Sequence, residues 1–211
     1  MKSKLFSRRG ILVNSAMAGV GIAGAVAVET ITSHPVFATM DRDNNDAEIL
    51  NNALFYEHQA IWAYGFAAGK LTNTDVGKAV LAVALSNQKD HMAHRDLLTE
   101  AVRSLGGNPV SAESSYDLSS YLNKGEGNID SDVNIAKLAL ALETDAAIAY
   151  TQEAAKLKNP ALITAGASIG TTESAHAAAI RATFKALGVD LEVVPAAFVN
   201  AENRSSWVLT V

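Results

Sequence analysis

The chain has 211 residues and a formal net charge of −5, and it contains no cysteine, so disulfide bonds and thiolate metal sites are excluded. No basic stripe is interleaved with aromatic residues, which argues against a nucleic-acid partner. Hydrophobic residues make up 49% of the chain and aromatic residues only 6%. Because alanine supplies much of the apolar content, closely packed helices are favoured.

The first 38 residues have the three-part layout of an export signal. Basic residues at positions 2, 4, 8 and 9 precede an apolar run over residues 10–28, and small residues near position 38 suit cleavage. The segment SRRGIL at residues 7–12 resembles a twin-arginine signal, which implies the twin-arginine export machinery as a partner. The alternative is that this signal helix, nearly long enough to span a bilayer, remains as an N-terminal anchor.

Both alternatives place the main domain outside the cytoplasm, in the periplasm or the cell envelope. Loss of residues 1–38 would remove four basic residues and one acidic residue and leave a net charge of −8. An acidic exported domain suits metal cations better than polyanions.

The remainder of the chain predicts helices in two pairs. After a polar leader over residues 39–46, apolar residues recur at steps of three and four, as they do on one face of a helix. Gly106 and Gly188 are expected to end helices, and Pro160 to begin one. The four predicted helices cover approximately residues 47–71, 75–105, 131–157 and 160–187.

Two further segments lie outside these helices. The connection over residues 107–130 is long, which is typical of a crossover along a bundle. The C-terminal tail over residues 189–211 is expected to dock on the bundle through apolar side chains. Those available are Val193, Val194, Phe198 and Trp207.

Polar side chains interrupt the apolar stripes of all four predicted helices. A buried carboxylate is costly unless it is paired or binds a metal, so these positions are candidate metal ligands. The candidates are Glu57, His91, His94, Glu143, Glu173 and His176. The alternative is that these groups pair with one another and bind no metal. His58 lies about 100° from Glu57 around its helix and is expected at the surface.

The second helix pair repeats the first. On the first and third helices, a glutamate is followed seven residues later by a tyrosine, which is expected to pack with its hydroxyl buried. On the second and fourth helices, an offset of 82 residues aligns two polar positions, and it also aligns Tyr116 with Phe198. The aligned polar pairs are Glu57 with Glu143, Tyr64 with Tyr150, His91 with Glu173, and His94 with His176.

This arrangement resembles the ferritin-like superfamily, which is all-α. Its members are antiparallel four-helix bundles with a long crossover between helices two and three, and the ligand pattern is Glu, Glu-x-x-His, Glu and Glu-x-x-His. The resemblance covers residues 47–188 and is strongest to exported bacterial members. It implies that the six candidates ligate one or two metal ions.

His91 departs from the pattern, because the family has a glutamate at this position. Two divalent ions bring four positive charges against three carboxylates, so a neutral His91 leaves two ions less well compensated. Three outcomes stay open: an asymmetric two-metal site, a single-metal site, or a site lost from an inherited scaffold. Asp90 is adjacent and is expected to act only outside the ligand set.

The mixed Glu/His set favours iron or manganese as the cofactor, with zinc also compatible. The resemblance implies an exported metal-binding protein that oxidises Fe(II) or turns over oxygen or peroxide, which makes it an oxidoreductase if it is an enzyme. The expected partners are metal ions and small oxidants. The alternative is a metal-free structural or stress-associated envelope protein. Nothing in the sequence indicates a large cage, so a monomer or homodimer is expected.

Overall fold

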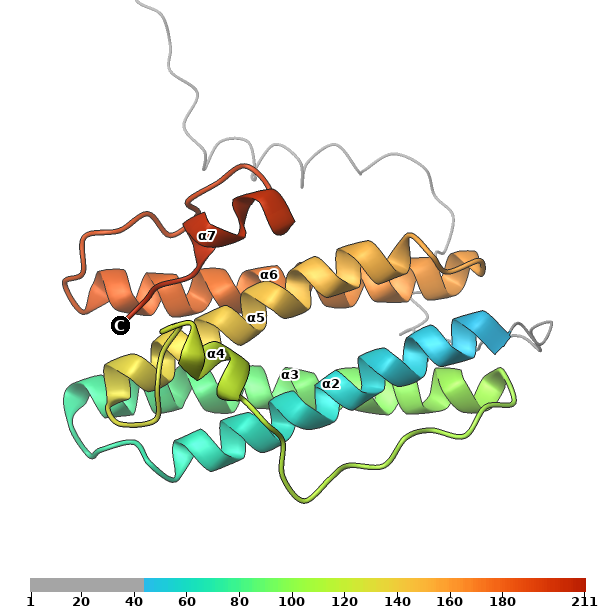
Figure 1. Cartoon of the computed structure of the whole chain (residues 1–211), viewed down its shortest axis with the longest axis horizontal. Coiled ribbons are helices and arrows are strands. Elements are labelled where there is room, and N and C mark those ends of the chain that lie inside the picture. The colour runs from blue at the N-terminus through green and yellow to red at the C-terminus, as the bar shows by residue number, and fades with distance from the viewer. Residues whose placement is uncertain (1–43) are drawn as a thin grey trace, which may run out of the picture. The chain divides into compact units, whose positions relative to one another are not determined.

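The computed structural model describes residues 44–211. The predicted export signal at residues 1–38 and the leader up to residue 43 lie outside the described residues. Within the described part, the predicted all-α architecture is confirmed, with two helical hairpins joined by a long crossover (Figure 1). None of the helices described combines the length and the apolar character needed to cross a bilayer.

The hairpins are built from four long helices of the described chain. The first hairpin pairs α2 with α3, and the second pairs α5 with α6 (Figure 1). The crossover at residues 105–131 contains the short helix α4, and the tail contains a 3₁₀ turn, η1, and the short helix α7. The bounds are α2 Asn44–Ala68, α3 Asp75–Ser104, α4 Ser119–Asn123, α5 Asp132–Ala154, α6 Pro160–Ala186, η1 Ala201–Asn203 and α7 Arg204–Trp207.

Capping residues define the helix ends. The side chains of Thr74, Ser131 and Asn159 accept hydrogen bonds from the first free backbone N–H groups of α3, α5 and α6. After α3 and α6, Gly106 and Gly188 take positive φ angles of 76° and 92°, which glycine adopts without a steric penalty. The helix ends therefore lie within three residues of those predicted.

Asp46 shows why α2 begins at Asn44 and not at the predicted residue 47. The Asp46 side chain is only 1% exposed. Its carboxylate accepts hydrogen bonds from the backbone N–H groups of Lys158, at 3.1 Å, and Asn159, at 3.2 Å. The first turn of α2 thus fixes the turn between α5 and α6, and this long-range contact orders residues that looked like a polar leader.

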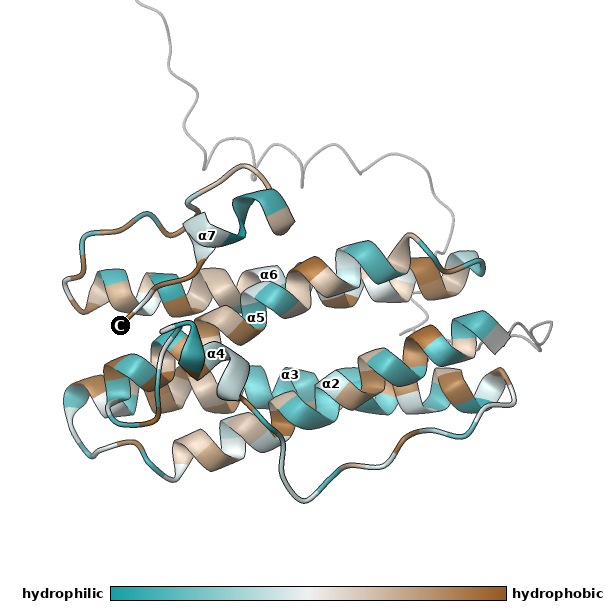
Figure 2. Ribbon diagram, viewed as in Figure 1, coloured by the Kyte–Doolittle hydropathy of each residue, from teal (hydrophilic) through white to brown (hydrophobic). Residues whose placement is uncertain are grey.

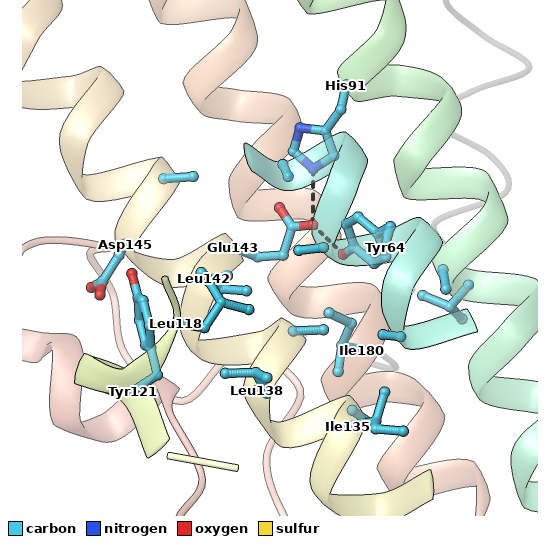
Figure 3. A pocket seen from close by; sticks show the side chains of 18 of the residues that line it. Tyr64, His91, Leu118, Tyr121, Ile135, Leu138, Leu142, Glu143, Asp145 and Ile180 are labelled. Atoms are coloured by element: carbon cyan, nitrogen blue, oxygen red, sulfur yellow. Dashed lines mark hydrogen bonds and ion pairs between the residues drawn. The ribbon is translucent and has the colours of Figure 1, made fainter. Parts of the chain in front are cut away.

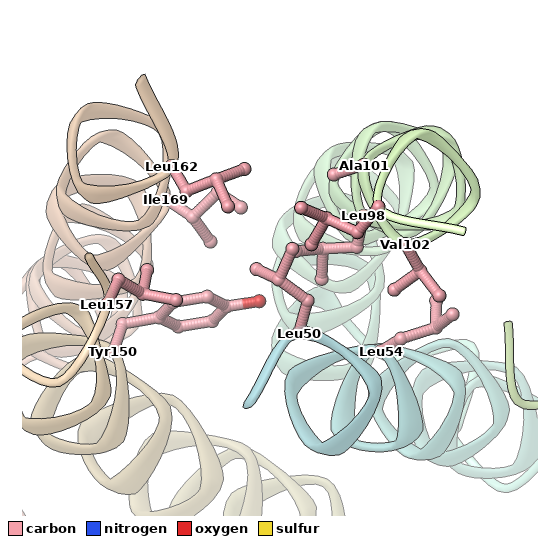
Figure 4. Packing of buried hydrophobic residues seen from close by; sticks show 10 residues of the cluster. Leu50, Leu54, Leu98, Ala101, Val102, Tyr150, Leu157, Leu162 and Ile169 are labelled. Atoms are coloured by element: carbon pink, nitrogen blue, oxygen red, sulfur yellow. The ribbon is translucent and has the colours of Figure 1, made fainter. Parts of the chain in front are cut away.

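The core divides along the bundle axis. One end is closed by a cluster of mainly leucine side chains from α2, α3 and α6, with Tyr150 of α5 and Leu157 just after it (Figure 4). The other end is built from α3, α5, α6 and the tail, around Ile135, Leu140 and Phe184. Figure 2 shows polar and apolar residues alternating along each helix, as expected when one stripe faces inward.

The tail docks on the bundle differently from the prediction. Trp207 is buried and packs in the core, as expected, and Val193 is partly buried. The predicted docking of Val194 and Phe198 is wrong, because these side chains are 61% and 68% exposed. The aligned position of Phe198, Tyr116, is buried, so the repeat does not extend to this pair.

Arg181 on α6 also anchors the tail. It is 4% exposed and donates hydrogen bonds to the carbonyl oxygens of Trp207, at 2.6 Å, and Glu192, at 2.9 Å. Charge-assisted hydrogen bonds to backbone carbonyls therefore add to the apolar contacts that hold the tail on the bundle.

Candidate metal centre

All six candidate residues converge at the middle of the bundle. Glu57 projects from α2, Glu143 from α5, and a pair from each of α3 and α6. Each pair is three residues apart, so both of its members face the same way. The side chains of the six are at most 11% exposed. The structure therefore brings together the complete predicted set, whose role as metal ligands stays a prediction.

His91 lies between the glutamates of α2 and α5. Its Nδ1 is 2.8 Å from Oε2 of Glu57, and its Nε2 is 3.1 Å from Oε1 of Glu143. Burial lowers the pKa of His91, but Glu143 and Glu57 raise it more, so the net pKa lies well above the ordinary value. In the metal-free protein, His91 therefore joins these two carboxylates as an imidazolium.

His176 makes corresponding contacts from α6. Its Nδ1 is 3.2 Å from Oε2 of Glu143 and 3.2 Å from Oε2 of Glu173. Its Nε2 is 3.2 Å from Oδ2 of Asp90, whose side chain is 47% exposed. Asp90 thus links the buried cluster to the surface from outside the six, as predicted. A carboxylate on the outer nitrogen of a histidine is a common way to orient a metal ligand.

His94 and Glu173 leave two buried atoms without a hydrogen bond. Nδ1 of His94 and Oε1 of Glu173 lie 2.9 Å apart and form an ion pair when His94 is protonated, although neither atom has a hydrogen-bond partner of acceptable geometry. Unsatisfied buried polar atoms are rare because each costs the desolvation of its group. A cation that accepted both lone pairs would remove this cost.

The donor atoms fall into two overlapping groups. In each group, one atom from each residue lies within 4.8 Å of all the others. Both groups contain His91 and Glu173; one adds Glu57 and His94, and the other adds Glu143 and His176. Buried nitrogen and oxygen donors at this spacing could hold a metal ion. A carboxylate can serve two ions, but a neutral imidazole offers one lone pair, so the groups are chemically unequal.

The glutamates are held by tyrosines of the opposite hairpin. Tyr64 of α2 donates a hydrogen bond to Oε1 of Glu143, and Tyr150 of α5 donates one to Oε1 of Glu57. Burial and the facing glutamate both raise the pKa of each phenol well above its ordinary value. Both phenols therefore stay protonated and serve as donors to the carboxylates.

Asn87 is a buried residue of the site that the sequence reasoning did not single out. Its Nδ2 donates to the hydroxyl oxygen of Tyr64 at 3.0 Å and to Oε1 of Glu143 at 3.4 Å. Asn87 lies one turn before His91 on the same stripe, and an amide at such a position is a signal for a buried hydrogen bond. The aligned residue of α6 is Ile169, so only one tyrosine–glutamate pair has an amide beside it.

Burial and charge set the pKa of the remaining groups in opposite directions. Burial raises the pKa of Glu143, but His91 and His176 lower it more, so the net pKa lies well below the ordinary value. The pKa of Glu57 is also lowered, because the hydrogen bond from His91 and the positive charges of His91 and His94 outweigh its burial. Burial and the neighbouring Glu143 raise the pKa of Glu173, which makes it the carboxylate of the cluster that protonates most readily.

The other two histidines gain protons for the same reason. Burial lowers the pKa of His94, but Glu173 and Glu57 raise it to about 9. Burial likewise lowers the pKa of His176, but Glu143 and Glu173 raise it to about 10. His58 lies outside the cluster, as predicted, although it is partly covered by the crossover, with Nε2 3.2 Å from the carbonyl oxygen of Val110.

A cavity of about 510 Å³ reaches the cluster between α2 and α5 (Figure 3). Glu57, His91 and Glu143 border it, together with both tyrosines. The dashed lines in Figure 3 mark the contacts of Glu143 with His91 and Tyr64 at its inner end. The cavity thus gives a small molecule access to the cluster from one side of the bundle.

Comparisons with known proteins agree with this fold. The family model of the ferritin-like domain matches residues 45–186, and the chain belongs to this family. Among solved structures, a conserved hypothetical protein, rv2844, from Mycobacterium tuberculosis matches with a TM-score of 0.53 and 22% identity, over 74% of this chain and 97% of that chain. At this identity the likeness concerns the fold alone. No match was found among curated proteins.

Proposed function

We propose that the protein binds iron or manganese at the six-residue cluster and uses the metal to oxidise Fe(II) or to react with oxygen or peroxide. The observation that carries the proposal is the convergence of six buried Glu and His side chains in two overlapping groups, in each of which one donor atom from every residue lies within 4.8 Å of the others. Buried carboxylates and imidazoles are costly unless they are paired or bind a metal, and this set offers nitrogen and oxygen lone pairs at a spacing that could hold an ion.

The donor set supports this choice of metals. Carboxylate oxygens with imidazole nitrogens suit iron and manganese, while zinc also accepts such ligands. We assign Glu57, His94, Glu143, Glu173 and His176 as ligands, with His91 as a sixth. Since Glu173 can be shared and neutral His91 cannot, a first ion is expected to bind more tightly than a second.

The chain's own residues prepare the site for redox chemistry. A bound iron or manganese ion would supply the change of oxidation state. Tyr64 and Tyr150 hold Glu143 and Glu57 in place, and Asp90 orients His176 from outside. Carboxylate ligands favour the more highly charged state of a metal, because they contribute negative charge directly to the ion.

Metal-dependent stability tests the proposal. Adding Fe(II) without oxygen, or Mn(II), to metal-free full-length protein should raise the free energy of unfolding by about 2.7 kcal/mol at roughly 100 times Kd. Glu173→Ala and Glu173→Gln should abolish this rise. Glu48→Ala, which changes an exposed carboxylate of α2, should keep it. Native protein with less than about 0.1 equivalent of either metal, and no uptake on reconstitution, would overturn the proposal.

A metal-free structural role is the second candidate. It is favoured by the internal pairing of His91 with Glu57 and Glu143, which satisfies much of the cluster without any ion. On this alternative, Glu173→Ala lowers the free energy of unfolding, and added metal leaves wild-type stability unchanged. Anomalous X-ray scattering at the iron and manganese edges would separate the two candidates and identify the ion.

Export belongs to the proposal on the strength of residues 7–12, whose sequence resembles a twin-arginine signal. We expect the main domain in the periplasm or cell envelope, as a monomer or homodimer. Replacing Arg8 and Arg9 together by lysine should retain the full chain in the cytoplasm, as measured by cell fractionation. Unchanged export of that variant would contradict the twin-arginine route.

A further inference from the structure

The cavity beside the cluster is bounded by small apolar side chains on two facing helices. Four alanines of α2 and four of α5 line it, including Ala63 and Ala136. Leu118 and Tyr121, from the crossover, also line it (Figure 3). The volume of about 510 Å³ lies within the range of roughly 300–1,000 Å³ that is typical of small-molecule sites.

The cavity and the leucine-rich closed end occupy different parts of the bundle. At the closed end, Leu54, Leu98 and Leu162 are at most 1% exposed and fill the interior (Figure 4). Along the cavity, α2 and α5 present alanines, whose side chains fill less space than the leucines of the closed end. An unfilled apolar cavity destabilises the fold, because its lining loses packing contacts, and a ligand that fills it restores them.

Polar groups are concentrated where the cavity meets the cluster. Glu57, Tyr64, Glu143 and Tyr150 stand at that end, and all four are already engaged in the two tyrosine–glutamate hydrogen bonds. Most of the remaining lining is hydrocarbon, although polar side chains such as Asn52, Gln59, Asp145 and Glu153 also line it. The rim is open to solvent, since Tyr56 is 52% exposed and Phe66 is 40% exposed.

We infer that this cavity binds an aliphatic chain, with the hydrocarbon end directed toward the cluster and the polar head at the rim between α2 and α5. The inference extends the proposed function by naming the class of molecule that is brought beside the metal centre. It rests on that function only for the use of the ligand, because binding itself needs no metal.

Chain-length dependence of binding tests the inference on metal-free full-length protein. The probes are 1-hexanol to 1-dodecanol, which should displace the uncharged fluorophore N-phenyl-1-naphthylamine. Each added methylene that is buried should tighten binding about fourfold, until the cavity is filled. No displacement, or an affinity independent of chain length, would overturn the inference.

Cavity-filling variants locate the binding. Ala84→Leu on α3 and Ala136→Leu on α5 place larger side chains at two lining positions and should weaken 1-dodecanol binding at least about tenfold. Ala82→Leu is the matched control, because Ala82 is exposed on the same helix as Ala84. Circular dichroism melting establishes that each variant folds, and a folded Ala84→Leu or Ala136→Leu protein with wild-type affinity would refute the site.

The metal-binding variants separate the two proposals. Glu173 does not line the cavity, so Glu173→Ala should abolish metal binding and leave 1-dodecanol binding unchanged. If wild-type protein binds 1-dodecanol but no metal, the proposed function fails and the aliphatic site stands. If it binds metal but no alcohol, the aliphatic site fails and the metal centre stands.

Discussion

Tyr64 donates its phenolic hydrogen bond to Glu143, a residue of the other hairpin. The reciprocal bond runs from Tyr150 to Glu57, so each tyrosine holds the glutamate of the opposite helix and not the one two turns before it on its own helix. These two hydrogen bonds link α2 to α5 at the level of the cluster, beside the cavity that both helices line. Removing either phenol therefore affects both the site and the contact between the hairpins.

Tyr64→Phe and Tyr150→Phe should each lower the free energy of unfolding of the metal-free protein by about 1–3 kcal/mol, because each leaves a buried carboxylate short of a donor. Urea denaturation measures this loss. Tyr56→Phe is the control, since Tyr56 is 52% exposed, and should change stability by less than about 0.5 kcal/mol. Equal effects of all three variants would show that the hydrogen bonds contribute no net stability.

The metal-free protein should lose stability as the pH rises. The raised pKa values of His94, about 9, and His176, about 10, mean that the folded state binds protons more tightly than the unfolded state. Their contribution is complete below about pH 6.5 and is lost as the pH rises through 9 to 10. Urea denaturation across this range measures the slope.

Two comparisons sharpen the pH experiment. His94→Gln together with His176→Gln should flatten the dependence, whereas His58→Gln, outside the cluster, should keep it. Metal should act in the opposite sense, because ligands must lose protons to bind an ion, so stabilisation by Mn(II) should grow from pH 6 to about 8. If the stability of the metal-free protein stayed constant from pH 6.5 to 10, His94 and His176 would not be protonated in the folded state as inferred.

His91→Glu restores the carboxylate of the family pattern and should change stability and metal capacity in opposite directions. Without metal, the variant loses the imidazolium between Glu57 and Glu143 and adds a like charge, which should cost about 3–5 kcal/mol. With metal, four carboxylates balance two divalent ions, so calorimetric titration should show a tighter second binding event. His58→Glu should leave both binding events unchanged, and a second binding event no tighter in His91→Glu than in the wild type would count against a two-ion site.

Asp90→Asn should weaken metal binding without unfolding the protein. The variant removes the carboxylate charge next to Nε2 of His176, so this ligand becomes less basic and is oriented less firmly. Loss of such a contact typically lowers metal affinity about 10- to 100-fold. Stability of the metal-free protein should change little, because Asp90 is 47% exposed. Asp96→Asn, an exposed neighbour on α3, is the control, and identical affinities of the two variants would remove Asp90 from the site.

The sequence by itself determined the helices and the six-residue cluster. Apolar residues at steps of three and four define the inward face, and a charged residue on that face must be buried, so Glu143 and Glu173 could be recognised without coordinates. The repeat then identified their partners by alignment. These inferences use only positions on one helix at a time, where local periodicity is sufficient.

Only the tertiary structure decided which groups meet across helices. Three contacts join segments that lie far apart in the chain. They are the reciprocal tyrosine–glutamate hydrogen bonds between the hairpins, the contact of Asp46 with the α5–α6 turn, and the docking of the tail through Arg181. Such contacts depend on how each helix is rotated and shifted against its neighbours, which periodicity along one helix does not specify. The alanine-lined cavity arises in the same way, since a small residue leaves a void only where the facing helix also lacks a large one.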